Sequence, residues 1–346
     1  MGKVKKFAIV YDRPVYSSGE WVTGRIVVEL TDQIEVTALK MHAKGQEYVR
    51  WTERHGSSKH RHTRVYTQKL RYFKHKYWII GSESEEVTVL QSGRHEYPFS
   101  LVLPHVPPLP SSFKDHYGNV SYWMTAKLHR PWKLRAKVKE EFTVFNQIDI
   151  NSPGLLEPLM ATDEKTICCW CCASGPIILN AKIERKGYIV GESIQIVAEI
   201  ENHSSRTVVP KAAIYKTTVY HAKSKSKTCS ESIAEVKGDS ILAGQKESRN
   251  VMVLKIPQVP PTLMNCTIIQ MGYSLKVGVS IPGAMNLTVN LPIVIGTIPL
   301  HSFGGPVSDF NTPHLMDYSN VNPALPDGPP VEPGFQVSNR NFGYYT

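Results

Sequence analysis

One short sequence pattern occurs twice in this chain, and the repeat constrains the fold more than any other feature. In both copies a tyrosine is followed three residues later by Gly-Glu and then by alternating apolar residues, from Tyr16 to Glu20 and from Tyr188 to Glu192. The copies are displaced by 172 positions (188 − 16). A proline-rich pattern, Leu-Pro-x-Val-Pro-Pro from Leu103, recurs as Ile-Pro-x-Val-Pro-Pro further along. Because both patterns recur in the same order, the chain is predicted to contain two homologous domains in tandem.

Each copy of the pattern predicts a turn followed by a half-buried β-strand. Gly19 and Gly191 allow a backbone with positive φ. After the second turn, Ile194, Ile196 and Ala198 alternate with other residues, and a period of two places them on one face of a strand. The Pro-Pro pairs predict crossovers between sheets, because proline has no N–H to donate within a ladder. With 24 prolines and 23 glycines between short alternating runs, we expect an all-β fold of two immunoglobulin-like β-sandwiches.

The repeat and the composition together predict the domain boundaries. We expect one sandwich over residues 1–150, an interdomain linker over 151–175, a second sandwich over 176–297 and a tail over 298–346. The proline-rich pattern is displaced by only 153 positions (256 − 103), so the second copy is predicted to lack the basic hairpin at 52–64. Eight of the 24 prolines fall in the last fifty residues, where charges are few, so the tail is predicted to be disordered.

The positive charge of the chain lies almost entirely in its first domain. The formal net charge is +10, and residues 1–150 carry 24 Lys and Arg against 15 Asp and Glu. In the segment 133–139, cations alternate with Leu134, Ala136 and Val138, which predicts a strand with a row of positive charges ~6.5 Å apart on one face. The cations of this row are Lys133, Arg135, Lys137 and Lys139. We interpret the row either as a site for an acidic or phosphorylated peptide or anionic lipid, or as protection of an edge strand against pairing. Nucleic acid is not expected as a partner, because the aromatic residues alternate inward and form no stacking platform.

Four of the six cysteines are clustered, and their spacing leaves several interpretations open. The cluster consists of Cys168, Cys169, Cys171 and Cys172. A zinc knuckle would need a second matching pair of ligands, whereas a small apolar strand entering the second domain needs none, and S-acylation at a membrane surface is a further alternative. Clustered cysteines are not typical of a secreted disulfide framework. The basic N-terminus is not followed by an apolar segment, so we expect a cytosolic chain with reduced thiols.

The patterns that carry catalysis or cofactor binding are missing from the sequence. No glycine-rich nucleotide-binding loop, no Gly-x-Ser-x-Gly elbow and no His-Glu-x-x-His zinc motif is present. We therefore predict a binding protein that is not an enzyme, with no cofactor and no metal site.

Longer motifs resemble a known family over roughly residues 1–300. The paired turns, the two Pro-Pro crossovers and five further segments are similar to those of the α-arrestins, in the subgroup that includes the thioredoxin-interacting protein. The further segments are Gly93–Phe99, Leu128–Trp132, Lys182–Gly187, Val209–Ile214 and Ile281–Ala284. The resemblance implies two arrestin-type β-sandwiches joined by a hinge. It also implies a cytosolic adaptor, recruited to the plasma membrane and endosomes, that recognises receptors and transporters and directs their endocytosis, endosomal sorting and ubiquitin-dependent downregulation.

The sequence departs from the family pattern at two places. Family members recruit HECT-type ubiquitin ligases through Pro-Pro-x-Tyr motifs, which bind WW domains as polyproline II, and no such motif occurs here. The chain is therefore either an adaptor with an unusual ligase-binding tail or a cargo-binding scaffold uncoupled from the ligase. The candidate docking prolines of the tail are Pro323, Pro326, Pro329, Pro330 and Pro333. Where the thioredoxin-interacting relative has a cysteine, this chain has Lys246, so no mixed disulfide with thioredoxin is expected there. Redox or zinc sensing at the cysteine cluster is the alternative from a different class of function.

Overall fold

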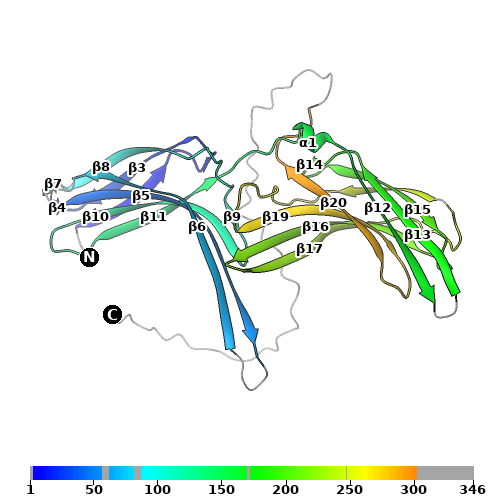
Figure 1. Ribbon diagram of the computed structural model, residues 1–346. Helices are drawn as coiled ribbons and strands as arrows, with labels where there is room; N and C mark the ends of the chain where they lie inside the picture. Colours follow the sequence, from blue (N-terminus) through cyan, green and yellow to red (C-terminus); the bar gives the residue numbers. More distant parts are fainter. Residues whose placement is uncertain (1–2, 57–61, 82–86, 170–171, 247, 302–346) are drawn as a thin grey trace, which may run out of the picture. The chain divides into compact units, whose positions relative to one another are not determined.

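The computed structural model describes residues 3–56, 62–81, 87–169, 172–246 and 248–301, and it shows two β-sandwiches in tandem (Figure 1). The predicted all-β class and the two-domain organisation are confirmed. Among the described residues the one α-helix, α1, is the four-residue segment Pro153–Leu156, which lies between the sandwiches. The predicted tail lies outside the described residues from 302 onwards.

The first sandwich consists of a three-stranded and a six-stranded sheet, with a small additional ladder. The three-stranded sheet has the order β1-β3-β8, and the six-stranded sheet has the order β2-β11-β10-β5-β6, with β9 paired to β10 and with β4 and β7 paired separately. The bounds are β1 Val4–Tyr11, β2 Val15–Tyr16, β3 Trp21–Leu30, β4 Ile34–Val36, β5 Ala38–His55, β6 His62–Ile80, β7 Thr88–Leu90, β8 Gly93–Val102, β9 Phe113–Lys114, β10 Gly118–His129 and β11 Ala136–Val144.

The second sandwich repeats this plan. A four-stranded sheet has the order β12-β13-β15-β18, and a five-stranded sheet has the order β14-β20-β19-β16-β17. The bounds are β12 Leu159–Cys169, β13 Cys172–Ile183, β14 Gly187–Ile189, β15 Ser193–Asn202, β16 Val209–Ala222, β17 Lys225–Lys237, β18 Ser248–Lys255, β19 Ile269–Ser280 and β20 Leu287–Gly296. Its core includes the predicted alternating residues Ile194, Ile196 and Ala198, all of which are buried.

The repeated turn has the same hydrogen bonding in both sandwiches. The carboxylate of Glu20 accepts the backbone N–H of Ser17 at 2.9 Å, and that of Glu192 accepts the N–H of Ile189 at 2.9 Å. The glycine before each glutamate has a positive φ, 83° in the first copy and 88° in the second. The turn therefore depends on a glycine that reaches the left-handed region and on a carboxylate that satisfies an otherwise free donor.

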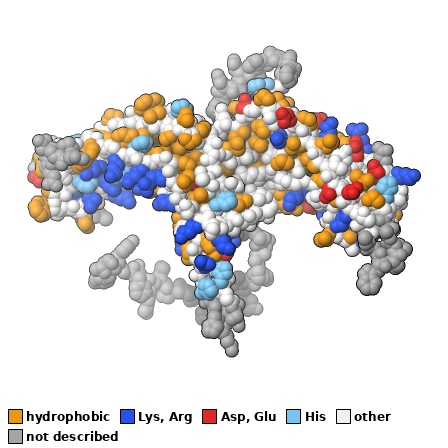
Figure 2. All heavy atoms as spheres, in the orientation of Figure 1, with side chains coloured by type: hydrophobic (Ala, Val, Ile, Leu, Met, Phe, Trp, Pro, Cys, Tyr) orange, Lys and Arg blue, Asp and Glu red, His pale blue; other side chains and the backbone are white. Residues whose placement is uncertain are grey.

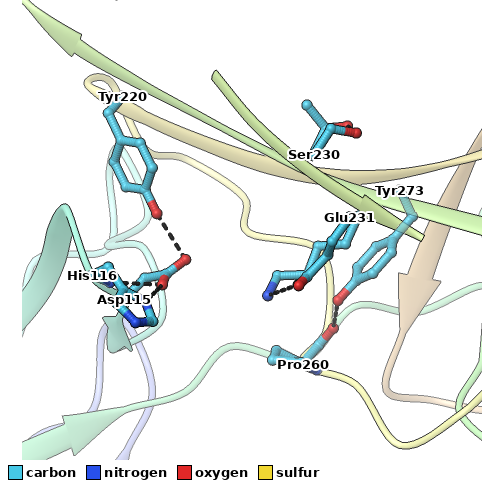
Figure 3. A network of polar contacts seen from close by, with 9 residues as sticks. Asp115, His116, Tyr220, Ser230, Glu231, Pro260 and Tyr273 are labelled. Carbon is cyan, nitrogen blue, oxygen red and sulfur yellow. Dashed lines mark hydrogen bonds and ion pairs between the residues drawn. The ribbon is translucent and has the colours of Figure 1, made fainter. Parts of the chain in front are cut away.

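The proline-rich crossovers are fixed by buried tyrosines. The hydroxyl of Tyr122 donates to the carbonyl of Pro110 at 2.7 Å. In the second sandwich the hydroxyl of Tyr273 donates to the carbonyl of Pro260 at 2.6 Å, as Figure 3 shows. Each tyrosine projects from a central strand toward the crossover that closes its sandwich. The two copies therefore share this tyrosine contact as well as the turn.

Two sequence-based expectations about the second sandwich need correction. The sequence predicts that residues 159–169 belong to the linker, but they form β12, which pairs antiparallel with β13. The basic hairpin was expected to be lost from the second copy, but the β16–β17 hairpin occupies the same place in the sheet order with strands of 14 and 13 residues, against 18 and 19 for β5 and β6. The second copy therefore has a shorter hairpin, and both of its strands remain paired in the sheet.

Candidate anion-binding face

The structure changes the geometry of the predicted cationic row. Only Lys137 and Lys139 lie in β11, which begins at Ala136. Lys133 and Arg135 lie in the preceding turn, where Leu134 is 93% exposed and does not pack inward. The prediction of one continuous strand over 133–139 is therefore wrong. The physical reason is the turn that joins β10 to β11, which includes Pro131 and a residue with positive φ and so delays the start of the ladder.

The two strand lysines belong instead to a wider cationic surface on the outer face of the six-stranded sheet. Lys137 on β11 is paired in register with Lys127 on β10, and Lys127 is paired with Lys40 on β5. Neighbouring strands lie ~4.8 Å apart, so three cations of three strands form a row across the sheet. Figure 2 shows Lys and Arg side chains gathered on the first sandwich.

Strand β6 extends the same surface. His42 of β5 is paired with Lys76 of β6, and Lys44 is paired with Lys74. The intervening residues of β5, such as Met41 and Ala43, are buried on the opposite face, which confirms that the cations point outward. We define the cationic face as Lys40, Lys44, Lys74, Lys76, Lys127, Arg135, Lys137 and Lys139.

The cations of the face raise one another's electrostatic energy. Partial burial, together with Lys137, Arg135, Lys76 and Lys40, lowers the pKa of Lys127, and partial burial, together with Lys74, Arg71 and Lys127, lowers the pKa of Lys44. At His42, burial and the surrounding lysines lower the pKa to about 4, so the imidazole is neutral at neutral pH. An anion bound here would relieve this repulsion.

Few carboxylates neutralise the face. Within the described part of the chain, Lys139 is the one cation of the face that forms an ion pair, with Glu141 on the same strand. Lys139 also lies 4.6 Å from the ring centroid of Trp123, and Lys40 lies 3.8 Å from that of Trp78. The aromatic rings hold the ammonium groups without cancelling their charge.

The row predicted from the sequence contains only part of this face. It omits the lysines of β5, β6 and β10, although Lys40, His42 and Lys44 alternate with buried residues at strand period. That alternation was a usable signal. What it could not provide is the pairing of three strands, which brings residues up to 97 positions apart (137 − 40) into one row.

A second feature that sequence reasoning missed is a buried carboxylate between the sandwiches. Glu47 lies on the inner face of β5 and is fully buried. Its oxygens accept the backbone N–H groups of Thr267, Ile268 and Ile269 at 3.1, 2.9 and 2.6 Å, and the hydroxyl of Tyr72 at 2.8 Å. Burial, reinforced by the nearby carboxylate, raises the pKa of Tyr72, so its hydroxyl stays protonated and donates. The carboxylate of the first sandwich thus binds a cluster of amide donors of the second.

A hydrogen bond between two side chains also links the two sandwiches. The hydroxyl of Tyr220, at the end of β16, donates to Asp115 at 2.7 Å (Figure 3). The ring of Tyr220 packs edge-on against Tyr117, with 5.6 Å between the ring centroids. The sequence offered one signal for Glu47, a charged residue at a position where the alternation predicts an apolar one. It gave no indication of the amide groups that Glu47 contacts.

The other predicted sites are covered less completely by the structure. Strand β12 ends at Cys169 and β13 begins at Cys172, so the cluster lies at a hairpin tip, but Cys171 and the side chains of Cys168, Cys169 and Cys172 lie outside what the structure describes. The candidate docking prolines from Pro323 to Pro333 also lie outside the described residues. Lys246 is exposed in the loop before β18. Among the described residues no group of three or more His, Cys, Asp or Glu could hold a metal ion.

Comparison with known proteins identifies the family. The family model of the arrestin (or S-antigen) N-terminal domain matches residues 7–151, and that of the C-terminal domain matches residues 173–300. Over 353 aligned residues the chain is 40% identical to arrestin domain-containing protein 4 of Homo sapiens. The alignment covers 99% of this chain and 83% of that protein. It is 34% identical over 331 residues to the thioredoxin-interacting protein of Mus musculus, covering 95% of this chain and 83% of that protein.

The chain belongs to the α-arrestin family. The resemblance inferred from the motifs is thereby confirmed, and the two sandwiches are the N-terminal and C-terminal arrestin domains. In this α-arrestin the cationic face lies wholly in the N-terminal domain, and Glu47 joins that domain to the C-terminal one. No helix among the described residues is long and apolar enough to span a membrane.

Proposed function

We propose that this α-arrestin is a non-enzymatic trafficking adaptor whose cationic face binds acidic or phosphorylated cytoplasmic segments of membrane receptors and transporters. Membership of the arrestin family supports an adaptor-type function that acts by binding partner proteins. In the proposed role the protein is recruited from the cytoplasm to the plasma membrane and endosomes, and it promotes the endocytosis, endosomal sorting and ubiquitin-dependent downregulation of its cargo.

The observation that carries the proposal is the pairing of Lys137, Lys127 and Lys40 across three strands. An extended peptide places alternate side chains ~6.5–7 Å apart, and lysines of one strand face have the same spacing. Phosphate or carboxylate groups at every second position of such a peptide would therefore meet successive rows of the face. Each contact would be a charge-assisted hydrogen bond, and each bound anion would reduce the repulsion among the lysines.

Charge reversal at the face tests the proposal. The triple variant Lys40→Glu, Lys127→Glu, Lys137→Glu should lower the affinity for a fluorescent peptide carrying phosphoserine at every second position by at least about tenfold, because three exposed ion pairs of roughly 0.5 kcal/mol each are lost and replaced by repulsion. Affinity is measured by fluorescence anisotropy, with the unphosphorylated peptide for comparison.

The matched control carries the same change of charge on the C-terminal domain. Lys223→Glu, Lys225→Glu, Lys246→Glu alters three exposed lysines away from the face. Equal losses of affinity in the two triple variants would mean that net charge alone attracts the peptide, and that outcome would refute a site at the face.

Coupling to a ubiquitin ligase is a separate part of the proposed function. Because no Pro-Pro-x-Tyr motif is present, we propose that any direct recruitment of a HECT-type ligase uses the tail prolines. Titration of WW domains against the full chain and against a Pro329→Ala, Pro330→Ala variant tests this idea. Binding that the variant loses supports a complete ubiquitylation adaptor. Absence of binding to the full chain supports a cargo-binding scaffold that competes with relatives able to recruit the ligase.

A further inference from the structure

The turn between β10 and β11 exposes two large apolar side chains. Trp132 is 101% exposed and Leu134 is 93% exposed, the two highest values among the large apolar residues that the structure describes. Single apolar residues on a surface are ordinary, but a fully exposed tryptophan and leucine two positions apart form a small projecting apolar surface. The turn lies at one end of the N-terminal domain (Figure 1).

The backbone of the turn holds the indole outward at a conformational cost. Trp132 has φ 52°, in the left-handed region that glycine and asparagine adopt far more readily than a bulky residue. Neither folding nor packing in this domain benefits from a tryptophan there, since its side chain contacts solvent on all sides. An unfavourable backbone that displays a large apolar side chain is the arrangement expected when the side chain has an external partner.

Cations surround the two apolar side chains within the same turn. The turn reads Arg-Pro-Trp-Lys-Leu-Arg from residue 130 to 135, so a cation stands at each end and Lys133 stands between Trp132 and Leu134. Lys133 and Arg135 are exposed, and Arg130 is partly buried. Partial burial and then nearby cations, Arg135 among them, lower the pKa values of Lys127 and His129. Arg135 therefore lies close enough to the cationic face to interact with it electrostatically. The external partner must therefore offer negative charge and an apolar environment side by side.

We propose that the turn 130–135 is a membrane anchor, in which Trp132 and Leu134 enter the interfacial layer of an anionic bilayer while Arg130, Lys133 and Arg135 contact the lipid headgroups. Tryptophan is enriched at this layer because its ring is apolar and its N–H is polar, and basic residues are attracted to anionic leaflets. An acidic peptide would satisfy the cations but would leave the indole and the leucine in water. The anchor goes beyond the proposed cargo site, since it concerns lipid and the side chains of the turn, of which only Arg135 also belongs to the cationic face.

The test measures binding of the full chain to vesicles of phosphatidylcholine with and without phosphatidylserine, by co-sedimentation. The wild type should bind the vesicles with phosphatidylserine, and the variant Trp132→Gly, Leu134→Ser should bind them at least roughly tenfold more weakly, because the apolar area that leaves water is lost while every cation remains. Brominated lipids should quench part of the tryptophan fluorescence of the wild type, and this quenching should disappear in the variant.

The variant is chosen so that misfolding cannot imitate the result. Glycine accepts the left-handed backbone better than tryptophan, so the thermal midpoint of the variant should be equal to or above that of the wild type. The matched control is Met285→Ser, which removes an 80% exposed apolar side chain from the equivalent turn of the C-terminal domain and should leave vesicle binding unchanged.

Other results would overturn the anchor and separate it from the cargo site. Equal vesicle binding by the wild type and the turn variant refutes it, as does an equal loss in Met285→Ser. If the wild type ignores both kinds of vesicle and the turn variant loses affinity for the phosphorylated peptide, the turn is part of a protein-binding site and the anchor is refuted. Normal peptide binding by the turn variant, together with lost vesicle binding, supports the anchor independently of the fate of the cargo proposal.

Discussion

Removal of the buried carboxylate of Glu47 should uncouple the two arrestin domains. In the change Glu47→Ala, three backbone N–H groups of residues 267–269 and the hydroxyl of Tyr72 lose their acceptor. A hydrogen bond to a charged acceptor contributes roughly 1.5–3 kcal/mol, and a buried donor without a partner costs a similar amount. Entry of water into the space left by the side chain returns part of this loss. We therefore expect a decrease of about 3–5 kcal/mol in the free energy of unfolding.

Glu47→Gln should have an intermediate effect for a reason visible in the geometry. One oxygen of Glu47 accepts the N–H groups of Ile268 and Ile269, and the other accepts the N–H of Thr267 and the hydroxyl of Tyr72. The single oxygen of glutamine can serve one of these pairs, whereas its amide group must then face two donors. A loss of about 1–3 kcal/mol is expected.

The assay combines urea unfolding of the full chain with hydrogen exchange of the segment 266–270. Because two domains are present, the transition is followed by several probes, and separation of one transition into two is itself a readout of uncoupling. The amides of Ile268 and Ile269 should exchange faster in Glu47→Ala. The control removes Glu231, labelled in Figure 3, whose side chain is 62% exposed and forms an ion pair with Lys216. Glu231→Ala should cost less than about 1 kcal/mol of stability. If Glu47→Ala lies within 1 kcal/mol of this control, or if exchange at the two amides is unchanged, the assignment of Glu47 as an interdomain anchor is refuted.

Three further predictions concern stability. Burial and the surrounding lysines lower the pKa of His42 in the folded chain to about 4. As the pH falls, the unfolded chain therefore takes up the proton first, and stability that is present above pH ~6.5 is lost between pH ~6.5 and 4. His42→Gln should reduce this acid-induced loss by about 1–2 kcal/mol, after allowance for partial exposure, as measured by urea unfolding at pH 7 and pH 4.5; identical pH profiles would contradict the assignment. Gly24→Ala should destabilise the N-terminal domain by about 2–4 kcal/mol, because the new Cβ would overlap the carbonyl oxygen of Val10. The new Cβ of Gly272→Ala would meet nothing within 4 Å, so this control should be tolerated in the same thermal melt. Tyr273→Phe should cost about 1 kcal/mol by loss of its hydrogen bond to the crossover, and an unchanged midpoint of unfolding would show that this bond does not hold the loop.

Those features that depend on residues close in sequence were predicted well. The turn at Gly19 and its copy at Gly191 require only a left-handed glycine and a carboxylate one residue later. Both requirements can be recognised in the local sequence, so the repeat is predicted at both places. The alternation along β15 was read from a period of two. The start of β11 was misplaced because alternation alone does not reveal where a turn ends, and Leu134 fits the apolar pattern although it lies in solvent.

Expectations about the linker and the second hairpin failed for a related reason. Polar and charged residues at 159–169 concealed β12, because the burial pattern of this strand, like that of any edge strand, is weak. The length difference between the repeats was interpreted as a missing hairpin, whereas insertion or loss of residues at the tip of a long hairpin changes its length without changing the sheet order.

The sequence by itself determined the two-domain β architecture, its α-arrestin character and the excess of positive charge in the first half, since these depend on local periodicity, repeated motifs and composition. Only the tertiary structure decided which charges act together. Strand register brings Lys40, Lys127 and Lys137 into one row, and docking of the domains brings Glu47 to amides 220 and more positions away. Local sequence sets the face on which a side chain points, but its neighbours across a sheet or an interface come from distant segments, and no local pattern records that pairing.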